Sequence, residues 1–226
     1  MKILAVDLGK FKSVACIYRA ENGEHEFRTI RTVHLQVEQL IDMVKPDRMV
    51  IEVSPLAGWV GDLVRKLGIE LQVANPNGAA WCWRNVKRKT DKLDALKLAR
   101  LSAMNQLLLV HLPEPKVREW RVLIQYRQSL VKRRTRIKNR MQAILDRVGV
   151  DRSGMGTKGW TEKGLAGWRE MARPLAKCIR GQLWRGELYE EIEQFEKVQE
   201  VLGRVEARLD AIAEKDKRVQ RLRTIP

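Results

Sequence analysis

The first 103 residues alternate between short β-branched runs and segments of helical periodicity, and this order limits the folds open to the chain. Strands are short and rich in β-branched residues, whereas helices repeat their apolar residues every three or four positions. The pattern predicts three strands followed by helix, strand, helix, strand and helix. The predicted strands are 2–7, 13–19, 25–30, 48–53 and 69–74, and the predicted helices are 34–44, 55–67 and 90–103.

Short turns join the first three predicted strands, which favours an antiparallel meander. A meander followed by β–α units implies a mixed sheet covered by helices. This is the strand order of the ribonuclease H-like fold. We therefore predict the α/β (mixed) class, with a ribonuclease H-like domain over residues 1–112.

Residues 113–226 have helical periodicity, and two stretches repeat apolar residues every seven positions. The first repeat covers 120–148, with Arg127 and Arg134 on its apolar seam. The second follows a Gly-rich connection near 151–183. The long helix that the first repeat predicts cannot bury its apolar stripe alone. We therefore expect an all-α coiled-coil arm that pairs internally or with another subunit.

The chain is strongly basic, because 44 Lys and Arg residues stand against 28 Asp and Glu residues, for a formal net charge of +16. Such an excess favours a polyanionic partner, most often nucleic acid. A solubilising surface is the alternative. Basic residues gather between 116 and 140 and acidic ones between 187 and 216, which indicates that the two stretches have different roles.

Several classes of protein are disfavoured by the sequence. Three widely spaced cysteines (Cys16, Cys82 and Cys178) argue against a disulfide scaffold and against a thiolate zinc site. The N-terminal apolar run is too short for a signal peptide and is interrupted by Asp7. No stretch approaches the roughly 20 apolar residues of a membrane-spanning helix. We therefore expect a cytoplasmic protein.

Four carboxylates stand where chemistry explains them better than packing does. Asp7 ends the first predicted strand, and Glu52 lies near the end of an apolar strand. Asp91 and Asp94 share one face of a predicted helix, about 5–6 Å apart. The three aspartates also have ordinary explanations, because Asp forms turns and acids in a first helical turn favour the helix dipole. An acid at the position of Glu52 is hard to explain by packing.

In a ribonuclease H-like sheet the first and fourth strands are neighbours, so Asp7 and Glu52 would lie at one sheet edge. The last helix would bring Asp91 and Asp94 across to them. Converging carboxylates repel one another unless cations neutralise them, and their hard oxygens suit Mg²⁺ or Mn²⁺. We predict catalytic and metal-binding roles for all four, with two ions acting on a phosphodiester.

At these residues the chain resembles the DEDD transposases of bacterial insertion sequences, a family related to pilin-gene-inverting recombinases and described as bridge-RNA-guided recombinases. The basic run from Val117 to Leu145 resembles the segment that follows the catalytic domain of that family. The resemblance covers about residues 1–150 and the closing RLRTIP. Its acidic motifs, in order, are VDLGK around Asp7, VIEVSP around Glu52 and KTDKLDALKLARL around Asp91 and Asp94.

The resemblance implies a RuvC-like catalytic domain, a coiled-coil arm used in dimerisation, and a C-terminal domain carrying a serine nucleophile. That last domain normally starts near Pro226, where this sequence stops, so we expect a chain that lacks it. The resemblance also implies DNA, a structured guide RNA and a homo-oligomer as partners. We expect a Mg²⁺-dependent transposase or recombinase that cleaves and exchanges DNA strands in transposition.

Basic residues beside aromatic ones suit phosphates and unstacked bases. Some of these side chains would instead pack under the sheet or keep the arm soluble. Arg127 and Arg134 would either pair with acids such as Glu191 on a partner helix or approach a phosphate. The predicted nucleic-acid-binding residues are Lys10, Trp81, Trp83, Arg84, Lys87, Arg88, Lys89, Lys132, Arg133, Arg136, Lys138 and Arg140.

Two other functions stay open. A non-catalytic module for nucleic-acid binding and dimerisation would share the same charge, and the expected absence of a serine domain favours it. A phosphotransferase of the actin-like or sugar-kinase type shares a strand-end Asp-x-Gly, but it needs further Gly-rich phosphate loops, and none follows in this sequence.

Overall fold

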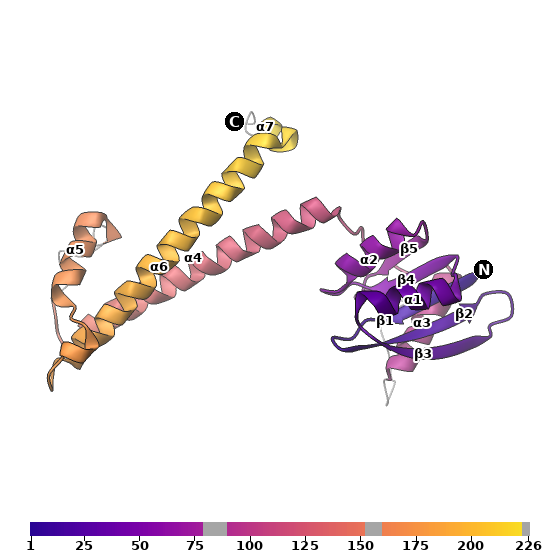
Figure 1. Cartoon of the computed structure of the whole chain (residues 1–226), viewed down its shortest axis with the longest axis horizontal. Helices are drawn as coiled ribbons and strands as arrows, with labels where there is room; N and C mark the ends of the chain where they lie inside the picture. The colour runs from indigo at the N-terminus through magenta and orange to yellow at the C-terminus, as the bar shows by residue number, and fades with distance from the viewer. Residues whose placement is uncertain (79–89, 152–159, 223–226) are drawn as a thin grey trace. The chain divides into compact units, whose positions relative to one another are not determined.

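Five strands form one mixed sheet in the N-terminal part of the chain, as the computed structural model shows (Figure 1). The strand order is β3-β2-β1-β4-β5, with β1 antiparallel to β2 and parallel to β4. The predicted mixed α/β class and the ribonuclease H-like order are therefore confirmed. The strands are β1 (Lys2–Asp7), β2 (Lys12–Arg19), β3 (His25–Arg31), β4 (Arg48–Glu52) and β5 (Glu70–Ala74).

The structure describes residues 1–78, 90–151 and 160–222. The chain divides into two compact units, Met1–Arg118 and Glu119–Pro226, which we call the sheet unit and the helical unit. Within the described ranges, no helix is long and apolar enough to cross a membrane.

Helices cover both faces of the sheet (Figure 1). Because strand side chains alternate between faces, Leu4 and Val6 of β1 join the core under α1 and α2, whereas Ile3 and Ala5 join the core under α3. All four are buried, as expected for a central strand covered on both sides. The helices are α1 (His34–Val44), α2 (Ala57–Lys66) and α3 (Asp91–Ala103).

Every element predicted for the first 103 residues is present, with its ends shifted by at most two residues. The largest shift is at the start of α2, which begins at Ala57 and not at residue 55. Thr90 is the N-cap of α3, where its hydroxyl accepts a hydrogen bond from the backbone N–H of Leu93 at 3.3 Å. Threonine suits this position, because its side-chain oxygen satisfies an N–H of the first turn that has no partner within the helix.

A polar network fixes the C-terminal end of α3 to the sheet. The Ser102 hydroxyl donates to the side-chain oxygen of Gln72 at 2.8 Å, and both residues are buried. The Arg48 guanidinium donates to the Ser102 carbonyl at 3.2 Å and lies 2.9 Å from a carboxylate oxygen of Glu70. Arg48 and Glu70 begin β4 and β5, so the N-terminal end of α3 points toward the carboxyl ends of these strands.

The last residues of the sheet unit are fastened to α2. Arg118, in the first turn of α4 (Pro115–Arg147), donates to the Asp62 carboxylate and to the Pro113 carbonyl. Arg65 donates to the Leu112 carbonyl at 2.9 Å. A Cβ added at Gly61 would lie 2.3 Å from a terminal methyl of Leu112, so a larger residue there would force the Leu112 side chain to move.

The helical unit is built on an antiparallel pair, α4 with α6 (Leu183–Lys215). Its core includes the predicted seam residues Leu130, Ile137 and Met141, packed with Phe195 and others from α6. Arg127, on the same seam, donates to Glu206 at 2.9 and 2.6 Å, and Arg134 donates to Gln199 at 3.0 Å. Both seam cations therefore find partners on α6.

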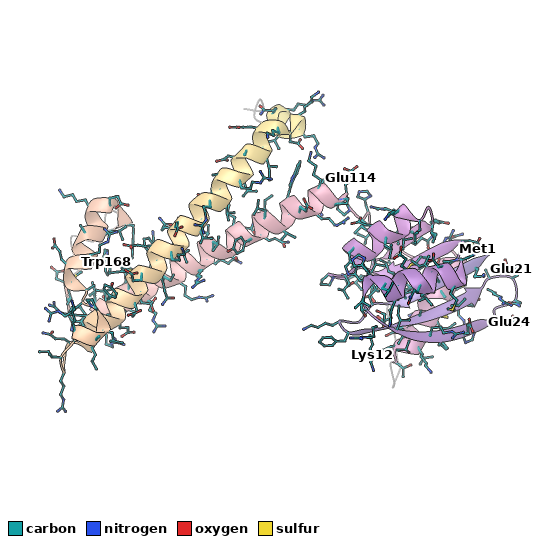
Figure 2. The ribbon with its side chains drawn as sticks, viewed as in Figure 1. Met1, Lys12, Glu21, Glu24, Glu114 and Trp168 are labelled. Atoms are coloured by element: carbon teal, nitrogen blue, oxygen red, sulfur yellow. The ribbon has the colours of Figure 1, made fainter. Side chains whose placement is uncertain are left out.

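A further helix, α5 (Glu162–Met171), lies inside the stretch predicted to be a Gly-rich connection. Its Trp168, labelled in Figure 2, is fully buried. The Trp168 ring stacks on the Trp160 ring, with 5.2 Å between the two ring centroids. Thr161 caps the helix by accepting from the Gly164 N–H at 3.2 Å. The short elements of this unit are the 3₁₀ helix η2 (Leu175–Lys177) and α7 (Lys217–Leu222).

Phe195→Ala tests the core of the helical unit. Phe195 is fully buried between α4, α5 and α6, so its truncation should lower the free energy of unfolding by about 3–5 kcal/mol. Urea unfolding followed by far-UV circular dichroism measures this change. Leu183→Ala, at a position 60% exposed, is the control and should shift stability by less than about 0.5 kcal/mol. Equal shifts for the two variants would contradict the packing described.

Gln72→Leu tests the anchor of α3. It leaves the buried Ser102 hydroxyl without its acceptor and should cost about 1–3 kcal/mol of stability. The double variant Gln72→Leu/Ser102→Ala removes both polar partners and should recover most of that loss. A double variant that loses as much as the two single variants together would show that the bond is not the stabilising interaction. Urea unfolding of the four proteins gives the coupling energy.

Candidate functional site

Asp7 and Glu52 end two neighbouring parallel strands. The register of β1 with β4 pairs Val6 with Ile51, so the next residue along each strand lies at the same carboxyl edge of the sheet. Both acids are half-buried. The predicted neighbourhood of the two strand ends is therefore present in the structure.

The alternation of the strands assigns both acids to one face. Asp7 follows Ala5 at a spacing of two, and Glu52 follows Val50 in the same way. Ala5 and Val50 belong to the core under α3. Since residues at a spacing of two share a face, Asp7 and Glu52 lie on the α3 side of the sheet.

The two helical acids differ in their environments. Asp94 is buried, with 8% of its surface exposed, on the face of α3 that packs on the sheet. Asp91 begins the helix and is exposed. The structure thus brings Asp94 to the same side of the sheet as Asp7 and Glu52. It leaves Asp91 exposed to solvent at the N-terminal end of α3.

The arrangement is not a closed metal centre. Across residues 1–78, 90–151 and 160–222, no three His, Cys, Asp or Glu side chains form a group able to hold a metal ion. The donor chemistry still fits a hard cation, because the strand-end and helical acids offer only carboxylate oxygens. The metal-binding and catalytic roles of Asp7, Glu52, Asp91 and Asp94 stay predictions.

Cys16 lies in the core between this part of the sheet and α3. Burial raises the pKa of its thiol to about 12, an effect that the nearby positive charge of Arg100 partly opposes. Because only the thiolate is a good nucleophile or metal ligand, Cys16 is a packing residue.

The turn after Asp7 is held in one conformation. A Cβ added at Gly9 would lie 2.2 Å from the Lys12 carbonyl oxygen, so only glycine fits there. The Thr32 hydroxyl donates to the Gly9 carbonyl at 2.7 Å, and the Thr32 N–H donates to the Phe11 carbonyl at 3.0 Å. The buried Ser13 hydroxyl lies 2.7 Å from the same Thr32 hydroxyl.

The predicted nucleic-acid-binding residues fall into three sets. Lys10, Lys132, Arg133 and Arg136 are exposed. The structure does not describe residues 79–89, so it leaves untested the predicted residues in that range, which are Trp81, Trp83, Arg84, Lys87, Arg88 and Lys89.

The third set, Lys138 and Arg140, has partners inside the helical unit. The Lys138 ammonium lies 4.6 Å from the Trp160 ring centroid, and its pKa is lowered, chiefly by burial and also by the charge of Arg134. Arg140 lies 2.8 Å from the Glu191 carboxylate. Burial raises the pKa of Glu191, and Arg140 opposes that shift. These contacts give both residues a structural role.

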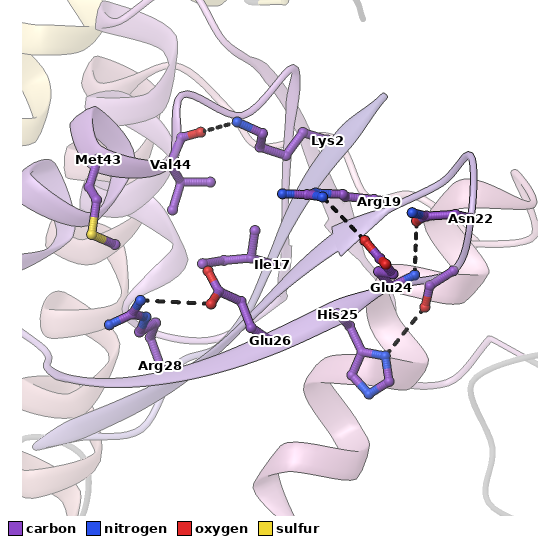
Figure 3. A pocket seen from close by; sticks show the side chains of 11 residues that line it. Lys2, Ile17, Arg19, Asn22, Glu24, His25, Glu26, Arg28, Met43 and Val44 are labelled. Atoms are coloured by element: carbon purple, nitrogen blue, oxygen red, sulfur yellow. Dashed lines mark hydrogen bonds and ion pairs between the residues drawn. The ribbon is translucent and has the colours of Figure 1, made fainter.

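A pocket of about 730 Å³ lies at the opposite end of β1, beside the first strand residue, Lys2 (Figure 3). The sequence did not indicate it. Its cations have partners: Lys2 donates to the Val44 carbonyl at 2.7 Å, and Arg19 pairs with Glu24 at 3.2 Å. We assign this pocket no role in the chemistry of the strand-end acids.

Comparisons with known proteins agree with the sequence motifs. A family model described as a transposase matches residues 4–150. Among solved structures, the chain is similar to Thermus thermophilus RuvC, at 12% identity and a TM-score of 0.35, over 49% of this chain and 100% of that one. It is also similar to a Fowlpox virus resolvase solved with Holliday junction DNA, at 16% identity and a TM-score of 0.30, over 46% and 98%. No curated protein matches.

The family match spans more than half of the chain. It begins in β1, includes the three acidic motifs, and ends just beyond α4. The resemblance seen in the motifs is thereby confirmed, and the chain belongs to the DEDD transposase family.

Proposed function

We propose that this chain is a subunit of a divalent-metal-dependent DNA transposase or recombinase that cleaves and exchanges strands in transposition. Membership of a transposase family supports an enzyme acting on nucleic acid. One observation carries the specific proposal: Asp7 and Glu52 end adjacent parallel strands, on the sheet face where Asp94 is buried. Since its substrate would be cellular DNA, we expect it to act in the cytoplasm.

Asp7, Glu52 and Asp94 would hold Mg²⁺ or Mn²⁺, with Asp91 contributing from the exposed end of the helix. Two such ions, when bound, activate a nucleophile and stabilise the leaving oxygen of a phosphodiester. The polypeptide contributes orientation, because strand ends and a buried helix face hold carboxylates more firmly than loops do. The Ser102–Gln72 bond supports this by fixing the far end of α3.

The exposed cations of α4 would bind phosphates. Lys132, Arg133 and Arg136 are spaced by one, three and four residues, so they lie on one side of the helix. A patch of this kind attracts a DNA or guide-RNA backbone with little regard for sequence, and the binding weakens as salt rises. We propose this patch as the part of the helical unit that contacts nucleic acid.

We also propose that the α4–α6 pair is the coiled-coil arm through which copies of the chain associate. Within the helical unit, Val122 and Tyr126 of α4 are exposed apolar side chains four residues apart, so they share one face of the helix. Their cover by a second copy would remove this surface from water. A homodimer or higher homo-oligomer is therefore the expected state.

A second function has its own support. The exposed cations of α4 would serve equally in a module that binds nucleic acid and dimerises without cleaving. Metal affinity and strand cleavage separate the two proposals, and the two experiments below measure them.

The first experiment measures metal binding directly. Mn²⁺ titration followed by electron paramagnetic resonance should show saturable binding to the chain. Asp7→Asn and Glu52→Gln should each weaken that binding by about tenfold or more, since each removes a charged ligand of the proposed site. Asp42→Asn, at an exposed acid of α1, is the matched control and should bind as the wild type does. Equal affinities for all four proteins would refute the metal site.

The second experiment measures strand cleavage in Mg²⁺ on a supercoiled plasmid that carries transposon ends. Asp7→Asn, Glu52→Gln and Asp94→Asn should each slow nicking by about 100-fold or more. Binding of the same DNA in EDTA should stay within about threefold of wild type, because the removed charges oppose DNA binding and do not support it. Asp42→Asn is again the control. If the three variants nick the plasmid as fast as Asp42→Asn does, the catalytic assignment is wrong.

A further inference from the structure

We propose that Phe11 stacks on an unpaired nucleic-acid base and that Lys10 binds the adjacent phosphate, at the sheet edge where Asp7 lies. The proposal rests on the proposed nucleic-acid substrate and adds to it a residue that would hold a nucleotide next to the strand-end acids. Phe11 did not stand out in the sequence.

The exposure of Phe11 is the first observation. Of the large apolar side chains in the described ranges it is the most exposed, at 75%. It lies in the short turn between β1 and β2, four residues after Asp7. An aromatic ring left in water is available to stack on the base of a nucleotide.

The rigidity of the turn is the second observation. Gly9, Ser13 and Thr32 hold the backbone on both sides of Phe11 through the hydrogen bonds described above. The ring is therefore displayed from a fixed backbone, and binding through it costs less conformational entropy than binding through a mobile loop.

The charge around the ring identifies the partner. The Lys10 ammonium lies 5.2 Å from the Phe11 ring centroid, and Lys12 and Arg31 stand directly opposite each other across the β2–β3 register. Like charges facing across strands repel, and a phosphate between them would relieve the repulsion. An aromatic ring with a lysine beside it suits a nucleotide, whose base stacks while its phosphate is bound.

An unpaired base is required because a base inside a duplex has no free face. DNA strands opened during exchange and the loops of a structured RNA both present such bases. Phe11 and Lys10 would recognise what the two share, an unpaired base next to a phosphate. Binding measured separately with single-stranded DNA and single-stranded RNA shows which of them is the partner.

The test measures binding by the full chain in EDTA, with fluorescein-labelled single-stranded DNA, single-stranded RNA and duplex DNA followed by fluorescence anisotropy. Phe11→Ala should weaken binding of at least one single strand by about 5- to 100-fold, the effect of losing one stacked base. Phe11→Trp should keep wild-type affinity within about threefold, because tryptophan also stacks. Duplex binding should change by less than about twofold.

Met43→Ala is the matched control, since Met43 is 58% exposed near the C-terminal end of α1, beside the pocket at the other end of β1. A loss confined to DNA or to RNA identifies the source of the base. Single-strand affinities of Phe11→Ala within about twofold of wild type would overturn the proposal, as would equal losses on duplex and single strands. So would a failure of Phe11→Trp to bind.

The outcome is separable from that of the metal site, because binding in EDTA does not depend on metal. The effect of Glu52→Gln on Mn²⁺ binding, a weakening by about tenfold or more, is measured separately without EDTA and without any nucleic-acid probe. If Phe11→Ala binds single strands as the wild type does while Glu52→Gln binds Mn²⁺ more weakly, only the stacking role of Phe11 is wrong. If Phe11→Ala weakens single-strand binding while Glu52→Gln binds Mn²⁺ normally, only the metal-binding role of Glu52 is wrong.

Discussion

The parallel pairing of β1 with β4 is the constraint on which the candidate site depends. Parallel neighbours end at the same sheet edge, so the register of Val6 with Ile51 brings Asp7 beside Glu52. An antiparallel β4 would instead carry Glu52 to the end of β1 that begins at Lys2, beside the pocket lined by cations and acids. The parallel direction of β4 therefore places Asp7 and Glu52 at one end of these strands and leaves the pocket beside Lys2 at the other.

The packing of α3 completes that edge. Its apolar face is buried on the sheet, and the Ser102–Gln72 bond fixes which end of the helix lies over the starts of the strands. One consequence is that Asp94 is buried on the sheet side while Asp91, three residues earlier, is exposed. The two acids that the motif treats alike are therefore not equivalent in the fold.

Much of the fold was predictable, because each strand and helix of the sheet unit carries its own period and its own stop signal. Local spacing alone identified Arg127 as a cation on the apolar seam that needs a partner. The partner of Arg127 could not be identified, since Glu206 lies 79 residues away and the helix offset decides the pairing. Helix α5 was missed because glycines around it masked the spacing of Leu165 and Trp168.

The sequence alone determined the order of the elements, the acidic motifs and the basic charge, since these depend on residue type and short-range spacing. Only the tertiary structure decided that Asp7 and Glu52 share an edge and a face, that Asp94 differs from Asp91, and that Lys138 and Arg140 have partners within the helical unit. It also singled out Phe11, because exposure depends on which other segments pack over a residue. Burial and pairing between distant segments are properties of the folded chain, and local spacing does not encode them.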